Sequence, residues 1–255
     1  MTYEAGVQSN PRNSGYRFGA GVADARAQRL PQPLDVIGRA YEPRAVAGDT
    51  AAGRLVAALS ALLQLVLPVI LLMALGATAL LYGDQPVTWL GSANARWLTL
   101  GHLIVPLTFF AIHLTNRRYG AGYALAQIVL AWLLGAAALG SAIDDLSLLA
   151  GRPLPALNEI VGFGVALFLA HLFSVLVFDR TRGPRWWSAP FQASLWGGVV
   201  FCLIAFPAAY LGTSADWFGP MLTYAGILGA AALVLLVPYC ALRSVVPPLS
   251  GFGGY

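Results

Sequence analysis

Long apolar runs separated by short polar segments dominate this chain between residues 55 and 242. No acidic residue or arginine lies deep inside any of these runs. There are six of them, at about residues 55–82, 97–115, 121–143, 160–178, 189–212 and 220–242. A helix of roughly 20 apolar residues crosses a hydrocarbon core of about 30 Å, and no period-two alternation indicates strands. The pattern therefore predicts an all-α integral membrane protein, a bundle of six transmembrane helices.

Proline residues lie inside four of the six runs, at Pro68, Pro106, Pro207 and Pro238. A proline inside a helix removes one backbone hydrogen bond and clashes with the preceding turn. Neighbouring helices compensate for such breaks within a membrane. We therefore expect local kinks at these four positions.

The polar segments at the two ends of the chain are predicted to lie outside the bundle of residues 55–243. Residues 244–255 form a short C-terminal tail. Residues 1–54 are polar and contain too few apolar side chains to bury a core, so we expect an extended or partner-docked cytoplasmic tail. Its contacts with other integral membrane subunits are expected at Leu30, Leu34, Ile37 and Tyr41.

The arginines are sorted between the two sides of the predicted bundle. All 15 basic residues are arginine, and 13 of them fall in the N-terminal tail, the loops after the second and fourth runs, and the C-terminus. The opposite side carries only Arg96 and Arg152. Because positively charged loops stay in the cytoplasm, both termini are predicted to be cytoplasmic. The lipid bilayer is then the main partner, and a bacterial inner membrane is the expected location.

The composition and motifs argue against several other classes of protein. Hydrophobic residues make up 58% of the chain and charged residues 10%, outside the usual range of soluble domains. The arginines are scattered between loops rather than clustered, so no nucleic-acid partner is expected. No nucleophile–base arrangement, zinc-ligand spacing or phosphate-binding loop is present, which argues against an enzyme, a metal site and a resident cofactor. One alternative is a haem or chlorophyll held by His113 and His171, since neutral imidazole is a common axial ligand.

Two segments resemble a known transporter family. Pro106–Gly120 reads PLTFFAIHLTNRRYG, and Phe168–Phe206 contains the turn Asp179–Arg182, the pair Trp186–Trp187 and a closing Ala205–Phe206. Both segments resemble the second to fifth spans of the vitamin uptake transporter family, whose best-known branch transports queuosine precursors. The resemblance implies six spans and the uptake of a small deazapurine.

This chain departs from the family's pattern where that family carries intramembrane acidic residues. An aspartate of the second span is replaced by His113. The acidic residue of the fourth span corresponds to Ser174, with His171 where a glutamine is usual, and that of the fifth span corresponds to Gly197. Coupling through carboxylates could not operate here as in the family. His113 or His171 could take over proton binding, because imidazole titrates near neutrality.

The resemblance implies a substrate site near mid-membrane among the second, fourth and fifth spans. Its candidate residues are His113, His171, Ser174, Ser194, Gly197 and Gly198. The two glycines would let a neighbouring helix or a flat ring approach closely. His113 has a second interpretation: it lies three residues before Asn116 and could simply form hydrogen bonds at the cytoplasmic headgroups. His171 is eight residues before Asp179, about 12 Å deeper along a helix, where an imidazole needs a partner.

Two functions from different classes remain open. The first is small-molecule uptake of the queuosine-precursor type. The second is a transporter-derived protein that no longer transports and serves as an accessory or structural subunit of a larger membrane complex, for example a photosynthetic or respiratory one. The loss of the intramembrane acidic residues and the added polar tail favour the second function, and the family resemblance favours the first.

Overall fold

The computed structural model describes residues 51–91, 94, 97–150, 157–210 and 216–248. This part of the chain is helical throughout, apart from loops and one isolated bridge between Pro86 and Thr99. The elements are α3 (Ala51–Leu81), η1 (Thr88–Leu90), α4 (Leu100–Tyr119), α5 (Ala121–Ala150), α6 (Leu157–Arg180), α7 (Ser188–Tyr210), α8 (Phe218–Val234) and α9 (Leu236–Leu242). The predicted all-α fold is confirmed for these residues.

Five segments of the described chain are long and apolar enough to cross a membrane. They are Arg54–Leu81, Ala121–Ser141, Ile160–Arg180, Ser188–Tyr210 and Phe218–Leu242. The last segment joins α8 to α9. The remaining long helix, α4, covers the second predicted span but is not among the five, because it is the most polar of the long helices. By length and composition, the chain is a multi-pass membrane protein.

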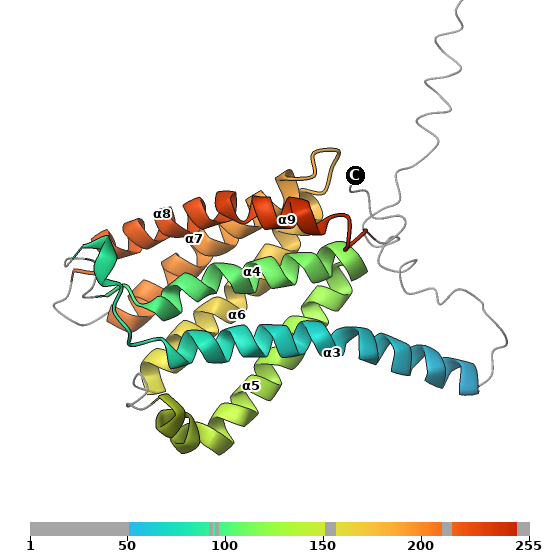
Figure 1. Ribbon diagram of the computed structural model, residues 1–255, viewed down its shortest axis with the longest axis horizontal. Coiled ribbons are helices and arrows are strands. Elements are labelled where there is room, and N and C mark those ends of the chain that lie inside the picture. Colours follow the sequence, from blue (N-terminus) through green and yellow to red (C-terminus); the bar gives the residue numbers. More distant parts are fainter. Residues whose placement is uncertain (1–50, 92–93, 95–96, 151–156, 211–215, 249–255) are drawn as a thin grey trace, which may run out of the picture.

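Helix α4 lies at the centre of the bundle. It contacts α3, α5, α6, α7 and α8, and Figure 1 shows the other long helices arranged around it. Eleven of its 20 residues are buried, including His113, Asn116 and Arg117. A polar helix is stable in this position because the neighbouring helices, rather than lipid, surround its polar side chains. Its interior location therefore accounts for its low hydropathy.

The helix boundaries follow from particular residues. Gly120 alone separates α4 from α5, and its φ of 89° lies in a region that glycine adopts without strain. The last predicted span is interrupted at Leu235, three residues before Pro238, where only a kink was expected. The helices continue through Pro68, Pro106 and Pro207. Helix α3 begins at Ala51 rather than at residue 55, because alanine at this position continues a helix readily. Predicted tail residues Leu30, Leu34, Ile37 and Tyr41 lie outside the described residues.

The N-terminal half of α3 has few neighbours in the described part of the chain. Its side chains from Arg54 to Ser60 are all exposed, and Figure 1 shows this end running past the ends of α4 and α5. The C-terminal half packs on α4 and α5, where Gln127 Nε2 donates to the Pro68 carbonyl at 2.9 Å. With 31 residues, α3 is about 46 Å long, more than the hydrocarbon thickness of a bilayer.

Aromatic contacts hold the N-terminal end of α4. His102 Nδ1 and the Thr99 hydroxyl are 2.7 Å apart in a capping box at the start of this helix. The Tyr224 hydroxyl donates to the His102 carbonyl at 2.7 Å, and the Trp97 ring packs edge-on against both rings. These contacts fix α4 against α8 and so set the position of the residues further along α4.

Candidate functional site

His171 of α6 is buried beside Thr108 of α4. The imidazole Nε2 and the Thr108 hydroxyl oxygen are 2.8 Å apart, and that hydroxyl donates its single hydrogen to the Val105 carbonyl at 2.6 Å. His171 Nε2 must therefore donate to Thr108. In the neutral ring this leaves Nδ1 as an acceptor, and Nδ1 is buried without a hydrogen-bond partner among the described residues.

His113 of α4 forms the second buried imidazole. Its Nδ1 lies 3.3 Å from the Ser194 hydroxyl of α7, its ring stacks on Phe178 at 5.2 Å between centroids, and its Nε2 has no partner within the described chain. Only 1% of His113 is exposed. The interpretation that it forms hydrogen bonds at the headgroups is therefore wrong: α4 continues to Tyr119, and the ring faces the bundle interior.

The Phe109 ring joins the two histidines. Its centroid is 4.9 Å from that of His171 and 6.4 Å from that of His113. Phe109, His113 and Asn116 follow an i, i+4, i+7 spacing, which places them on one face of α4. We give the name histidine cluster to five residues of α4, α6 and α7: Thr108, Phe109, His113, His171 and Ser194.

The glycines of α7 allow the helices around this cluster to approach closely. A Cβ at Gly197 would lie 2.7 Å from Phe109 Cε1 and 2.9 Å from Ser174 Cβ, so no side chain fits there. Gly198 instead faces α8, where a Cβ would meet Leu228 at 3.2 Å. Neighbouring helices therefore approach both glycines closely, and the approach of a substrate ring stays a prediction. Ser174 donates to the His171 carbonyl at 2.8 Å, so its hydroxyl stays within α6.

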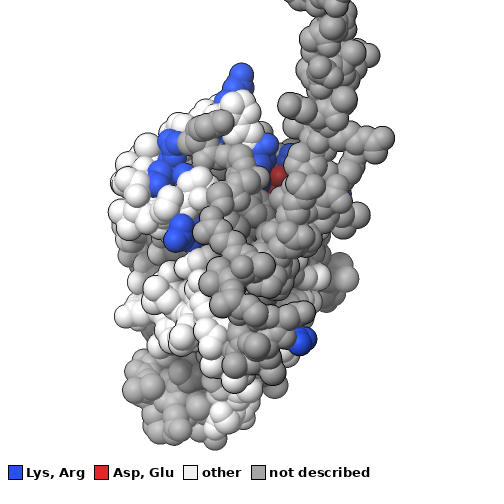
Figure 2. Space-filling view, turned by 90° about the vertical axis from the view of Figure 1, so that its right-hand side faces the viewer, with Lys and Arg blue, Asp and Glu red and all other residues white. Residues whose placement is uncertain are grey.

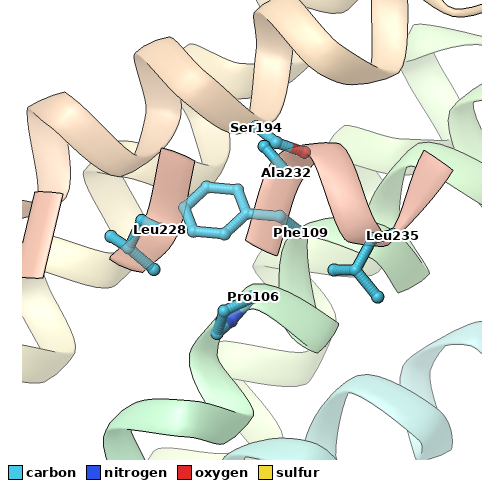
Figure 3. A pocket seen from close by; sticks show the side chains of 6 residues that line it. All are labelled: Pro106, Phe109, Ser194, Leu228, Ala232 and Leu235. Carbon is cyan, nitrogen blue, oxygen red and sulfur yellow. The ribbon is translucent and has the colours of Figure 1, made fainter. Parts of the chain in front are cut away.

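A small cavity adjoins the cluster on the side of α8. It holds about 10 Å³ and is lined by Pro106, Phe109, Ser194, Leu228, Ala232 and Leu235 (Figure 3). Such a volume is at the lower limit for one water molecule.

Five of the six predicted site residues lie together at the contact of α4, α6 and α7, while Gly198 faces away from the histidines.

Asn116 and Arg182 extend the polar contacts to the end of the bundle. Arg182 Nη2 donates to the Asn116 carbonyl at 2.8 Å and to its side-chain oxygen at 2.6 Å, while Arg182 Nε donates to Asp179 at 2.9 Å. Burial lowers the pKa of the Arg182 guanidinium, and the Asp179 carboxylate opposes this shift. Because arginine titrates far above neutrality, the side chain remains charged.

Sequence reasoning did not single out Thr108, Phe109, Asn116 or Arg182 as site residues. For Phe109 and Asn116 a signal was available in their helical spacing from His113. The contact between Thr108 and His171 joins residues 63 positions apart, and no pattern within either helix indicates it. Comparison of the chain with protein-family models, curated proteins and solved structures finds no match.

Proposed function

We propose that this protein transports a small, uncharged aromatic solute across the membrane, with the histidine cluster as its binding site. The observation that carries the proposal is the pair of buried imidazoles, His113 and His171, each with one ring nitrogen that lacks a partner among the described residues. An unpaired buried polar atom costs about 1–3 kcal/mol. Intramembrane polar groups retained at such cost are typically functional. Queuosine precursors are the substrate class that the family resemblance implies.

A flat heterocycle suits this environment chemically. His171 Nδ1 offers an acceptor to a ring N–H, while the Phe109 ring offers an aromatic surface for packing. The cavity of about 10 Å³ is too small for such a solute. Binding would therefore require Phe109 to move away from His171, as in alternating-access cycles where gating elements close over a central site. In this proposal the structure represents a closed state.

The proposal includes six membrane spans: the five apolar segments and α4, which is the second span along the chain. Both termini are then in the cytoplasm. Introduced cysteines test this topology in a background without Cys202 and Cys240. Thr88→Cys, in exposed η1, is expected to react with an impermeant maleimide from outside. Pro184→Cys, in the exposed turn beside three arginines, is expected to react only after permeabilisation, because arginine-rich loops stay inside. Labelling of Pro184→Cys in intact cells would contradict this orientation.

Uptake of a queuosine precursor into cells that lack their own transporter tests the function. His171→Leu is expected to lower uptake by about tenfold, as a lost buried hydrogen bond of 1–2 kcal/mol implies. Thr108→Val keeps the side-chain shape but removes the hydrogen-bond partner of His171, so this variant is also expected to lower uptake. Thr223→Val is the matched control, because Thr223 lies on the exposed face of α8 and bonds only within its own helix. Full uptake by His171→Leu would remove His171 from the mechanism.

An accessory subunit of a larger membrane complex is the second candidate. It is favoured by the exposed apolar N-terminal half of α3, including Leu55, Val56 and Leu59, which no described residue covers. Native purification in mild detergent separates the two functions. Stoichiometric co-purification with other membrane subunits, together with no uptake by the wild-type chain, would favour the subunit. A free chain that restores uptake would favour the transporter.

A further inference from the structure

Three arginines meet at the end of the bundle where α4 and α6 end. Arg117 is 6% exposed, and its guanidinium lies 5.9 Å from the centre of the Tyr239 ring. Arg243 lies 5.1 Å above the Trp186 ring, and Arg182 lies 4.9 Å from the Phe178 ring. We call Arg117, Arg182 and Arg243 the arginine cluster.

An aromatic ring lies against each guanidinium group of this cluster. Arg117 lies against Tyr239, Arg182 against Phe178 and Arg243 against Trp186. Phe178, Tyr239 and Trp186 pack together in one apolar cluster. The three guanidinium groups are therefore positioned by side chains that contact one another.

The positive charge of the cluster exceeds the negative charge near it. Asp179, paired with Arg182, is the only acidic residue that the described part of the chain places at this end. Arg117 Nε uses its hydrogen on the Val246 carbonyl, and Arg243 Nε is buried without a partner among the described residues. Figure 2 shows arginine side chains on this end of the molecule. Partly buried cations in excess of their partners are stabilised by a bound anion.

We propose that the arginine cluster binds the phosphate of an anionic phospholipid headgroup. Guanidinium groups match phosphate oxygens through paired N–H donors. The cluster lies at the ends of membrane-crossing helices, beside Trp186 and Trp187, and tryptophan is typical of the headgroup level. Cytoplasmic leaflets are rich in anionic lipids, which attract arginines near the membrane surface. Phe178, which lies against Arg182, also stacks on His113, but lipid binding at the arginine cluster does not depend on transport.

Native mass spectrometry of the full-length chain in mild detergent tests this site. With phosphatidylglycerol added, the wild type is expected to retain at least about fivefold more lipid than with phosphatidylcholine, which carries the same phosphate without net charge. Arg243→Gln is expected to reduce phosphatidylglycerol retention by about fivefold, because the variant loses the charged hydrogen bond from the guanidinium to the phosphate. Arg180→Gln, at the exposed end of α6, is the matched control and should leave retention within twofold.

Further measurements separate the possible explanations. Arg243→Lys keeps the charge and should retain phosphatidylglycerol at a level between those of the wild type and Arg243→Gln. This variant tests the role of Arg243 if Arg243→Gln folds poorly. Phosphatidylglycerol should also raise the midpoint of thermal unfolding for the wild type more than for Arg243→Lys. Displacement of the lipid by millimolar inorganic phosphate would contradict a lipid headgroup and assign the site to a soluble phosphate. Equal losses in Arg180→Gln and Arg243→Gln, or no preference for phosphatidylglycerol, would overturn the proposal.

Discussion

Replacing Gly101 by alanine is expected to destabilise the helix bundle by about 3 kcal/mol, at the upper end of the usual cost of overpacking. A Cβ at this position would overlap the carbonyl oxygen of Ala79 and lie 2.9 Å from the Cα of Gly83. Both neighbours are backbone atoms at the end of α3, so no side-chain rotation relieves the clash. The Gly101 N–H also donates to the Tyr82 carbonyl at 2.9 Å, and this bond holds the start of α4 against the turn that follows α3.

Gly226→Ala provides the matched control for this substitution. Gly226 is also helical, but a Cβ there would meet no atom within 4 Å. Its replacement is expected to be neutral or to stabilise the protein by up to about 1 kcal/mol, the difference in helix propensity between the two residues. Thermal unfolding in detergent measures both variants. An unfolding midpoint for Gly101→Ala equal to that of the wild type would show that α3 and α4 do not pack as described.

Gly197→Ala is expected to cost about 1–3 kcal/mol, because the new methyl group would lie within 3 Å of both Phe109 and Ser174. The contact with Ser174 is at its Cβ, which is fixed to the backbone of α6, so α7 must move away or Phe109 must turn. Turning Phe109 would separate its ring from His171. Reduced stability should therefore be accompanied by reduced uptake if the histidine cluster binds the solute.

The comparison for this variant is Gly229→Ala, on α8. A Cβ there would meet Leu195 Cδ1 at 3.6 Å, an ordinary van der Waals distance. Unfolding in increasing denaturant should distinguish the two alanine variants by at least about 1 kcal/mol. If Gly229→Ala were the less stable of the two, the close approach of α4, α6 and α7 at Gly197 would be contradicted.

The apolar runs were sufficient to predict the helices but not their places in the bundle. Proline chemistry marked Pro238 as a weak point, but it did not distinguish this position from Pro68, Pro106 and Pro207, where the helices continue. By contrast, α4 looked like one span among six, and only the packing of its polar face against α6 and α7 identifies it as the central helix. The distance from His113 to Asn116 left two interpretations open, a substrate site or the headgroups, because sequence distance gives depth along a helix and not the direction of the side chain.

The candidate site was predictable in part. His171, Ser174 and Gly197 were expected to lie together, and they do meet around Phe109. The partners of the two imidazoles could not be found this way, because Thr108 and Ser194 reach them from other helices. The arginine pattern predicted topology but not the contacts that Arg117 makes within the protein. Its contacts with Tyr239 and with the Val246 carbonyl depend on how the C-terminal helix returns over the end of α4.

The interior position of α4 has a consequence for how the chain enters the bilayer during synthesis. A segment with two arginines at one end and buried histidines, threonines and an asparagine partitions poorly into lipid when it is alone. Its sequence neighbours α3 and α5 are far more apolar, and both contact it. With only Gly120 between α4 and α5, these two helices would leave the insertion machinery as a hairpin against α3. Helix α4 would then take its final place only after α5, which is synthesised later, is available to cover its polar side chains.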